Sequence, residues 1–563
     1  MKELTTKQVR EMLLACTDRI IRNEPFLTRI DSAIGDGDHG IGMKNGMQAA
    51  RKYLEAATQE ENVYALYANM AQEMQKAMGG ASGMIFSTLF AGKASEKRPS
   101  AGLRPIDLAE QMRDGLRAIQ EIGHAHPGDK TMVDALAPAV DAMLANTASF
   151  EEMLSAGTEA AFEGMQNTKN YVAVFGRAKS LGERSLGHQD AGATSTWLIF
   201  TEMSDYVSGR KTPDPKLEAE KDKEESSNIK WKKKIINDPA DVVKEECEGF
   251  LAAFGNEFTA VPGVNGLIKK HIPEGKTALV IGGGAGHEPM FGFFLGENMA
   301  DAAASGNVFA SPDPVTIANT ARAADRGAGV LFLYGNYAGD NLNFDKAAEI
   351  LNKEGINVKT VRVWDDIASA PRDRITDRRG IGGDVLMVKI AGAACAQLPL
   401  NEAYRVTAKA RENLFSIGVG LEGATIPGQK EPIFTLPEDE MEYGLGIHGE
   451  PGIRRIKMQS ADVIVQSLYD RLVEESGLKE GDIVCTYVNG LGSTTLMELM
   501  IMNRKLSELL KESNISVHDM DVNSLVTTME MAGASISIMK MDDELLKYYN
   551  MSCYSPYYSK KQR

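Results

Sequence analysis

Apolar residues recur every three or four positions in the N-terminal part of the chain, a spacing that places them on one face of an α-helix. Val9, Leu13 and Ile20 lie on one such stripe, and Thr5 and Gln8 before it fit a helix-capping box. A second stripe follows Asp107 and consists of Leu108, Met112, Leu116, Ile119 and Ile122. The pattern predicts an all-helical domain over residues 1–210.

The pattern changes in the second half, where short runs rich in β-forming residues end in glycine-bearing turns. These runs are TALVIGGG (277–284), VLFLYGN (330–336) and IVCTYVNG (483–490). Between the second run and INVKTVRV (356–363), the segment FDKAAEILNKEG is predicted to be a helix that Gly355 ends. A strand, a helix and a strand at this spacing indicate a βαβ unit and a partly parallel sheet.

A charged, proline-bearing stretch with almost no apolar residues, 211–234, separates the two patterns. This composition is typical of a linker, which we place at 211–228. The expected fold class is therefore multidomain, α followed by α/β. The helical domain covers 1–210, and the α/β region has two subdomains, 229–411 and 412–563.

Length, composition and charge exclude several classes of function. A chain of 563 residues with 43% hydrophobic and 25% charged residues is typical of a globular protein with more than one core. The net charge of -16 argues against nonspecific nucleic-acid binding and against a basic membrane-binding face. There is no uncharged apolar run of membrane-spanning length and no signal-peptide core. The five scattered cysteines favour free thiols in a reducing compartment, so we expect a cytoplasmic protein.

The segment DSAIGDGDHGIGMKNG (31–46) places Asp31, Asp36 and Asp38 within eight positions, with glycines between them. Carboxylates this close repel one another, and a hard cation with oxygen ligands would cancel the repulsion. Glycine also lets backbone N–H groups turn toward phosphate oxygens. A solvated turn is the alternative for a lone DGD, whereas a calcium EF-hand does not fit, because its glycine position holds Ile41. The loop indicates a magnesium–nucleotide site.

Three further glycine-rich polar loops lie in the same domain: MGGASGMIFST (78–88), HPGDKTM (126–132) and GRAKSLGERSLGHQDAGATST (176–196). Each alone is typical of a helix connection, but several in one small domain favour an anion-binding site at helix N-termini. Two common nucleotide motifs are absent. Lys270 occupies the first glycine position of a Walker A motif ahead of EGKT, and GGGAGHEPM (282–290) does not match G-x-G-x-x-G.

Taken together, these stretches resemble the dihydroxyacetone kinase family. Residues 1–210 resemble its nucleotide-binding L half through DSAIGDGDHG, GGASG, PGDKTM and LGERSLGHQDAGATS. Residues from about 229 to 563 resemble its substrate-binding K half through IINDPADVV, GGGAGHEPM, NYAGDNLNF and MEYGLGIHGEPGIRR. In the familiar fused kinases the K half comes first, so the order is reversed here. The resemblance implies an eight-helix barrel for the first domain and a homodimer formed through the K-type region.

For the helical domain, the resemblance implies ATP as the phosphoryl donor and two magnesium ions held by Asp31, Asp36 and Asp38. The positive charge that these carboxylates require would then be metal. The positions that match nucleotide-contacting residues of the family are His39, Gly40, Ile41, Gly42, Ala81, Ser82, Gly123, Met132, Arg177, Asp190, Ala191 and Gly192.

For the K-type region, the resemblance implies that His448 attacks the ketone carbon of the substrate and forms a hemiaminal. A neutral imidazole nitrogen can do this reversibly, whereas an alcohol such as glycerol offers no electrophilic carbon. The resemblance also implies that His287 hydrogen-bonds the substrate and that Asp340 is the base for the attacking hydroxyl. The matching substrate positions are Gly284, Ala285, Gly286, His287, Gly335, Asp340 and His448.

The chain departs from the family at Gly335, where dihydroxyacetone enzymes usually carry a lysine that hydrogen-bonds a substrate hydroxyl. The vacated volume would suit a four-carbon ketose such as erythrulose. In the alternative, a neighbour such as Tyr334 compensates and dihydroxyacetone remains the substrate. The expected activity is phosphorylation of one of these ketoses by ATP.

Two other functions compete with an ATP-dependent kinase. One is a kinase linked to the phosphotransferase system, in which ADP or ATP stays bound as a cofactor. The other is a non-enzymatic regulator that senses a ketose. The fusion of both halves in one chain favours free ATP, and the intact carboxylates Asp31, Asp36 and Asp38 argue against a regulator.

Overall fold

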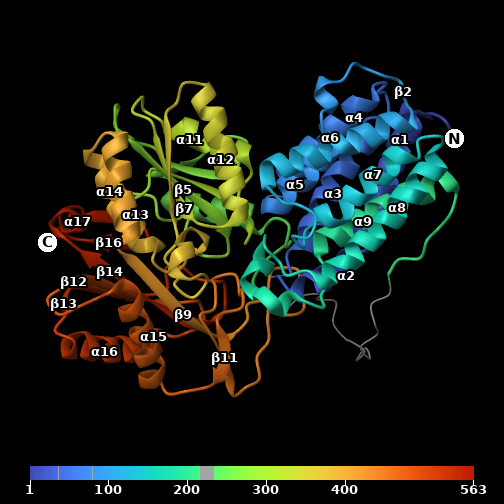
Figure 1. Ribbon diagram of the computed structural model, residues 1–563. Helices are drawn as coiled ribbons and strands as arrows, with labels where there is room; N and C mark the ends of the chain where they lie inside the picture. The colour runs from blue at the N-terminus through green and yellow to red at the C-terminus, as the bar shows by residue number, and fades with distance from the viewer. Residues whose placement is uncertain (36, 79, 216–233, 563) are drawn as a thin grey trace. The chain divides into compact units, whose positions relative to one another are not determined.

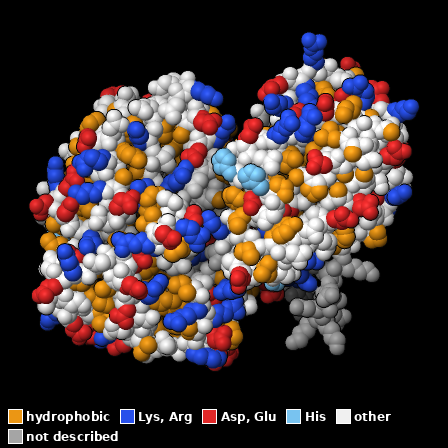
Figure 2. Space-filling model, in the orientation of Figure 1, with side chains coloured by type: hydrophobic (Ala, Val, Ile, Leu, Met, Phe, Trp, Pro, Cys, Tyr) orange, Lys and Arg blue, Asp and Glu red, His pale blue; other side chains and the backbone are white. Residues whose placement is uncertain are grey.

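The computed structural model describes residues 1–35, 37–78, 80–215 and 234–562. The chain divides into two compact units, 1–226 and 227–563, and each has its own hydrophobic core. Residues 216–228 of the predicted linker lie outside the described residues, as does Asp36. On the face that Figure 2 shows, acidic and basic side chains are interspersed over each unit.

The N-terminal unit is helical, as predicted (Figure 1). Thr5 and Gln8 form the predicted capping box at the start of the first helix, and Val9, Leu13 and Ile20 are fully buried. The short strands β1 (Leu4–Thr5) and β2 (Gly102–Leu103) pair with each other. The helices are α1 (Thr6–Arg22), α2 (Glu24–Ser32), α3 (His39–Ala56), α4 (Val63–Met78), α5 (Gly80–Ala91), α6 (Pro105–Gly123), α7 (Val133–Ala145), α8 (Phe150–Asn167) and α9 (Ala191–Ser208), with 3-10 turns η1 (Ala94–Glu96), η2 (Thr168–Asn170) and η3 (Arg177–Ser185).

Each predicted glycine-rich loop of this unit leads into the N-terminus of a helix. The aspartate loop precedes α3, and the other three loops precede or enter α5, α7 and α9. The first N–H groups of an α-helix have no partner within the helix, and the helix dipole favours negative charge there. The sequence therefore places several potential anion-binding termini in one unit.

The first sheet of the C-terminal unit has the strand order β3-β4-β6-β5-β7-β8. Strands β5, β6, β7 and β8 run parallel to their neighbours in this set, and all eight residues of β5 are buried. The predicted runs at 277–284 and 330–336 correspond to β5 and β7. The elements are α10 (Val242–Phe254), β3 (Phe258–Ala260), β4 (Gly266–Lys269), β5 (Ala278–Ala285), β6 (Ala302–Val308), α11 (Pro314–Ala324), β7 (Val330–Gly335), α12 (Ala338–Lys353), β8 (Val358–Val363), η4 (Arg372–Asp377), α13 (Asp384–Gln397) and α14 (Leu400–Glu412).

The predicted βαβ unit is β7–α12–β8, with the two strands parallel. Gly355 has a φ of +88° just after the helix, which explains why the helix ends there. The helix begins six residues earlier than the pattern predicts, at Ala338 rather than Phe344. Its first turn consists of polar and small residues that carry no apolar periodicity, and it contains Asp340.

The second sheet has the order β11-β10-β9-β14-β12-β13, and β12 is the predicted run at 483–490. A hairpin of two short strands follows near the C-terminus. The elements are β9 (Leu414–Glu422), β10 (Glu440–Tyr443), β11 (Arg454–Lys457), α15 (Ala461–Ser476), β12 (Ile483–Gly490), α16 (Leu496–Glu512), β13 (Ser516–Asn523), β14 (Ala532–Met541), α17 (Asp543–Tyr549), β15 (Cys553–Ser555) and β16 (Tyr558–Lys560).

One core joins the two sheets of the C-terminal unit. It contains Leu279 and Leu331 from the first sheet and Tyr487 and Met539 from the second. Helix α13 contributes to this core and is buried for twelve consecutive residues from Asp384, so it has no solvent-facing side over that length. Within the described residues, no helix is long and apolar enough to cross a membrane. The five cysteines carry free thiols.

Candidate active site

His287 lies in the loop that follows β5, at the carboxyl end of a parallel strand. Gly284 allows this strand end to approach the next loop, because a Cβ there would lie 2.7 Å from the backbone nitrogen of Ala310. Gly286 has a φ of +98°, a conformation that favours glycine. The His287 side chain is 1% exposed, and its Nδ1–H donates to the carbonyl oxygen of Thr527 at 2.6 Å. Its Nε2 therefore points away from that partner.

His448 lies in the glycine-rich loop between β10 and β11. Gly449 has a φ of +81°, and a Cβ on Gly446 would collide with Glu450 and Arg379. Glu450 accepts a hydrogen bond from the backbone N–H of His448 at 2.9 Å and another from its ring Nδ1–H at 3.0 Å. The histidine is 6% exposed and the glutamate 2%. The loop thus holds a carboxylate against one edge of the imidazole.

The two histidines meet through their other nitrogens, with Nε2 of His287 3.1 Å from Nε2 of His448. Each Nδ1 faces an oxygen acceptor, so each ring donates through Nδ1–H. A hydrogen bond between the two Nε2 atoms requires one additional proton on the pair, and the buried carboxylate of Glu450 would balance that positive charge.

Behind Glu450 lies a buried ion pair between Arg379 and Asp366. Asp366 Oδ2 accepts from two guanidinium nitrogens of Arg379 at 2.7 and 2.9 Å, and another lies 3.9 Å from Oε2 of Glu450. Burial alone would lower the pKa of Arg379, but the charges of Asp366 and Glu450 outweigh it and raise that pKa. Arg379 therefore places a permanent cation beside the side chain of Glu450.

Tyr337 connects the histidine pair to the end of β7. Its ring centroid is 4.7 Å from that of His448, in an edge-on arrangement, and its hydroxyl donates to the carbonyl of Gly380 at 2.9 Å. A Cβ on Gly335 would lie 3.3 Å from the Tyr337 ring and 3.7 Å from Oδ2 of Asp384. The space beside Gly335 is therefore not fully open, because Tyr337 and Asp384 border it.

The other predicted substrate residues lie on β5 and α12. Asp340 is half-buried in the first turn of α12, and Ala285 is the last residue of β5. Tyr334 faces the other side of β7 from Gly335, where its ring stacks on Phe344 at 4.2 Å and its hydroxyl accepts from Arg362. Tyr334 thus does not take the place of a side chain at position 335.

In the N-terminal unit, His39 joins three of the predicted loops. Its ring Nδ1 lies 3.3 Å from Oγ of Ser82 in α5, and its Nε2 lies 2.8 Å from Oγ of Ser195 in α9. Its backbone N–H donates to Oδ2 of Asp31 at 3.2 Å. Burial lowers the pKa of the imidazole, so the ring is neutral and acts as a bridge between helices. Asp31 lies in the last turn of α2, and Asp38 immediately precedes α3.

Asp190 caps the N-terminus of α9, where its Oδ1 accepts from the N–H of Ala193 at 2.6 Å. Burial and the charges of Asp134 and Asp31 raise its pKa to about 7. Next to it, a Cβ on Gly192 would lie 3.3 Å from Cβ of Met132. The structure therefore brings Asp31, Asp190, Gly192 and Met132, from three predicted loops, into one region.

The remaining predicted nucleotide residues lie at helix ends. Gly40, Ile41 and Gly42 are in the first turn of α3, and Ala81 and Ser82 are in the first turn of α5. Ala191 begins α9, and Arg177 begins η3. Gly123 ends α6, and its Cβ would lie 3.6 Å from Ile85 of α5. The described residues, which do not include Asp36, contain no group of three acidic, histidine or cysteine side chains that could hold a metal ion.

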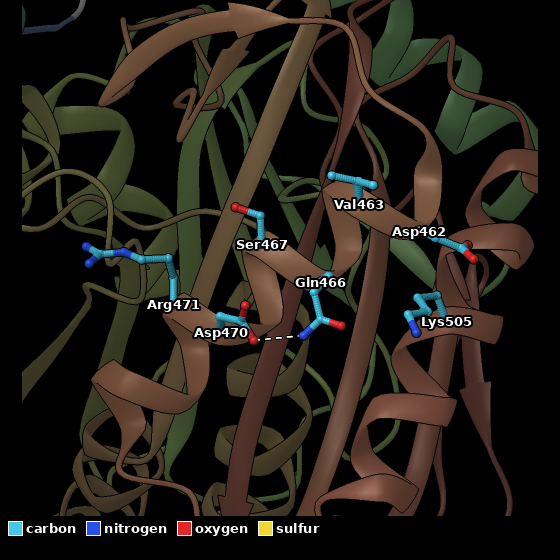
Figure 3. Close-up of a pocket in the computed structure, with 7 residues that line it drawn as sticks. All are labelled: Asp462, Val463, Gln466, Ser467, Asp470, Arg471 and Lys505. Carbon is cyan, nitrogen blue, oxygen red and sulfur yellow. Dashed lines mark hydrogen bonds between the residues drawn. The ribbon is translucent and has the colours of Figure 1, made fainter.

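The structure also contains a pocket that is separate from both predicted sites (Figure 3). Its lining residues come from α15 and α16 of the C-terminal unit. Gln466 donates to Asp470 at 2.8 Å across one turn of α15. The pocket is lined by Asp462, Val463, Gln466, Ser467, Asp470, Arg471 and Lys505, none of which was predicted to bind a ligand.

The fold and the two sites define a two-part protein, with a helical domain and a histidine-bearing α/β domain on one chain. The DAK2 domain matches residues 33–205, and the Dak1 domain matches residues 248–557, more than half of the chain. The chain belongs to the dihydroxyacetone kinase family, a family of phosphotransferases, with the order of its two domains as the sequence predicts.

Two curated relatives match similar shares of this chain but different shares of their own. The dihydroxyacetone-binding subunit of PTS-dependent dihydroxyacetone kinase 2 from Listeria innocua is 40% identical over 58% of this chain and 99% of its own length. The L-erythrulose kinase of Pectobacterium atrosepticum is 39% identical over 58% of this chain but only 56% of its own length. The crystal structure of the dihydroxyacetone kinase of C. freundii with AMP-PNP and Mg2+ matches with a TM-score of 0.53 and 28% identity, over 58% of this chain and 61% of that one.

Sequence reasoning missed Glu450, Tyr337 and Asp384. Glu450 had a local signal, because it stands two residues after His448 in the HGEPG segment. Tyr337 stands just before the AGD segment that contains Asp340. Asp384 reads as an ordinary acidic residue in the first turn of a helix, and only its burial and its position beside Gly335 distinguish it.

Proposed function

We propose that the protein is a kinase that uses ATP to phosphorylate a short-chain ketose, with the ketose held as a hemiaminal on His448. The observation that carries this proposal is the buried His287–His448 pair, in which Glu450 orients one ring and the Thr527 carbonyl orients the other. The family assignment supports it, since its curated relatives are named as dihydroxyacetone and erythrulose kinases.

The covalent step is an addition to the carbonyl group and needs no further reactant. A bond forms between Nε2 of His448 and the carbonyl carbon of the ketose, and the carbonyl oxygen takes a proton from Nε2 of His287, which carries it before the step. The alkylated ring is cationic, and its Nδ1–H already faces the carboxylate of Glu450. Because nothing leaves, the reverse steps release the ketose unchanged. Glycerol lacks the electrophilic carbon and cannot form this bond.

Asp340 is the proposed base for the ketose hydroxyl that attacks phosphorus. Its position in the first turn of α12 places the carboxylate near the positive end of the helix dipole, which stabilises its charged form. The carboxylate accepts the hydroxyl proton, and the oxygen forms its bond to the transferred phosphoryl group. His448 and Asp340 thus have separate roles, one holding the ketose and the other activating it.

The N-terminal unit is proposed to bind ATP with two magnesium ions through Asp31, Asp36 and Asp38. The residues present fit a hard cation, because they are carboxylates near Asp190, whose pKa is raised to about 7 by desolvation and by the charges of Asp134 and Asp31. Magnesium bound there neutralises the charge of the phosphates during transfer. The N-termini of α3, α5 and α9 offer N–H groups to phosphate oxygens.

The test uses the purified full-length protein with ATP, magnesium and either dihydroxyacetone or erythrulose, with phosphorus NMR to identify the product. We expect a phosphorylated ketose with no other protein present. A phosphotransferase-linked kinase would give product only after the phosphocarrier proteins are added, and would retain nucleotide through purification. A ketose-binding regulator would bind the ketose and give no product under either condition.

The proposed assembly is a homodimer through the C-terminal unit, which the resemblance to the K half implies. Light scattering on the full chain over a range of concentrations measures the association. Chemical cross-linking followed by mass spectrometry then identifies which unit's lysines are joined between two copies, and we expect those of the C-terminal unit. A monomeric full chain at micromolar concentration would contradict this assembly.

A further inference from the structure

Asp384 carries a buried carboxyl group that has no hydrogen-bond partner for either oxygen within the described residues. It is the first residue of α13 and is 2% exposed. Its neighbour Asp365 is equally buried, but that carboxyl accepts from the N–H groups of Ile381 at 2.8 Å and Gly383 at 2.9 Å. A buried polar group without a partner destabilises the folded state, so the lone carboxyl of Asp384 requires an explanation.

The position of this carboxyl ties it to the substrate site. Its Oδ2 lies 3.7 Å from where a Cβ would stand on Gly335, and the Tyr337 ring lies 3.3 Å from the same point. Tyr337 in turn packs edge-on against His448, with ring centroids 4.7 Å apart. Asp384 therefore borders the space in which the dihydroxyacetone enzymes of the family usually place a lysine side chain.

We infer that Asp384 is a specificity-determining residue whose carboxyl group hydrogen-bonds a hydroxyl of a ketose with more carbons than dihydroxyacetone. The inference rests on the proposed function, because it takes the ketose to be anchored at His448. A four-carbon ketose extends from that anchor by one more hydroxyl-bearing carbon. The partner that Asp384 lacks is that additional hydroxyl.

The chemistry of the carboxyl suits a hydroxyl better than a charged group. Burial, together with the charges of Asp365 and Asp340, raises the pKa of Asp384 well above its usual range, which favours the protonated form of the group. A protonated carboxyl both donates and accepts a hydrogen bond, as a hydroxyl does, whereas a lysine ammonium only donates. Asp384 is 2% exposed and His287 1%, so the two side chains are buried to a similar degree.

The test measures ketose binding by calorimetry without nucleotide, so the result does not depend on phosphoryl transfer. Asp384→Leu keeps the branching of the side chain and replaces both hydrogen-bonding oxygens with the somewhat larger methyl groups. We expect this variant to raise the ratio of Kd for the preferred erythrulose enantiomer to Kd for dihydroxyacetone at least tenfold. Its Tm should rise, because an unpartnered buried carboxyl has been removed. Asp384→Asn keeps a donor and an acceptor, so this variant should retain most of the wild-type preference for erythrulose.

The matched control is Asp301→Asn in the same unit. Asp301 is also fully buried, but it is paired with Lys269 and Lys276 and accepts from the N–H of Leu279. This control should lower Tm and leave the ratio of the two Kd values unchanged. An unchanged ratio in Asp384→Leu, with a raised Tm, would show a purely structural carboxyl and overturn the inference.

Parallel phosphorylation assays separate this result from the proposed function. Erythrulose binding that depends on Asp384, without a phosphorylated product in the presence of ATP and magnesium, would overturn the kinase proposal and support the subsite. A phosphorylated product with the same substrate preference in wild type and Asp384→Leu would support the kinase proposal and overturn the subsite. The absence of ketose binding by the wild-type protein would overturn both.

Discussion

Glu450 accepts two hydrogen bonds from His448, one from its backbone N–H at 2.9 Å and one from its ring Nδ1–H at 3.0 Å. The two contacts fix both the loop and the plane of the imidazole. They also leave Nε2 as the reactive nitrogen, facing His287. Since a ketose bonded to Nε2 makes the ring cationic, the same carboxylate would stabilise the adduct. Glu450 and His448 therefore act as one unit in the proposed chemistry.

The first prediction concerns the charge of Glu450. Glu450→Gln keeps the size of the side chain but removes the negative charge opposite the cationic ring. A hydrogen bond to a charged group contributes about 1.5–3 kcal/mol, so we expect kcat/KM for the ketose to fall roughly 10- to 150-fold. Glu442→Gln is the matched control, because Glu442 is buried in β10 and bonded to Arg455 and the N–H of Gly452. It should lower Tm without changing adduct formation.

The second prediction assigns the covalent bond. His448→Ala should lose the ketose adduct and most of the ketose affinity, while ATP binding by the same protein is retained. Mass spectrometry after hydride trapping should find the adduct on His448 in the wild type. His287→Asn is the companion variant, and it should form the adduct more slowly at the same position. An adduct on His287 would contradict the assignment of roles to the two histidines.

The third prediction separates the two sites. Asp38→Asn, or Asp36→Asn, removes a negative ligand from a dication and should reduce phosphoryl transfer roughly 100-fold or more. Ketose binding measured by calorimetry should be unchanged, because the substitution lies in the other unit. Asp18→Asn is the control for acidic residues of this unit, since Asp18 is an exposed partner of Arg51. Near-normal turnover at saturating magnesium would rule out the metal assignment.

The architecture was predictable where the apolar pattern is continuous or periodic. Buried parallel strands such as β5 and β7 appear as unbroken apolar runs, and α1 shows both its stripe and its capping box. The start of α12 was not predictable, because its first turn consists of polar and small residues without apolar periodicity. Functional loops follow the local chemistry of the site rather than the periodicity of the core.

The site was predictable only where its residues lie in recognisable segments. His287 and His448 stand in such segments, but the carbonyl that orients His287 belongs to Thr527, 240 residues away. No local pattern marks a backbone carbonyl as a partner. Asp384 is a similar case, because its significance comes from the absent side chain of Gly335, which a different strand contributes.

The fourth prediction concerns pH. The pKa of Glu246 is raised to about 8. Burial is the largest cause, and the negative charge of Glu288 and the hydrogen bond to it act in the same direction. A carboxyl whose pKa is higher in the folded state stabilises the fold fully below its unfolded pKa of about 4.5, and this stability is lost as the pH rises toward 8. Tm should therefore decline between pH 5 and 8, and Glu246→Gln, whose amide keeps a donor toward Glu288, should flatten the decline. Glu248→Gln, at an exposed position on the same helix, should not.

The fifth prediction concerns Gly335 and the choice of substrate. If the site favours a four-carbon ketose, kcat/KM for D- or L-erythrulose should exceed that for dihydroxyacetone. A wild-type preference for dihydroxyacetone of tenfold or more, about 1.4 kcal/mol of transition-state binding, would contradict this. The comparison needs both enantiomers, because only one of them can direct its additional hydroxyl toward Gly335.

Gly335→Lys should reverse that preference through Asp384. A Cβ at this position meets the Tyr337 ring at 3.3 Å, so the ring must shift by a few tenths of an ångström, and the lysine ammonium can then pair with the carboxyl of Asp384 beside it. The pair would occupy the hydroxyl-binding space and supply the donor that a triose requires. We expect kcat/KM for dihydroxyacetone relative to erythrulose to rise at least tenfold and Tm to rise as the buried carboxyl gains a partner. In the Asp384→Leu background the same lysine loses this partner, so the rise in Tm should be absent. Equal effects of Gly335→Lys on Tm in the two backgrounds would show that residues 335 and 384 do not interact.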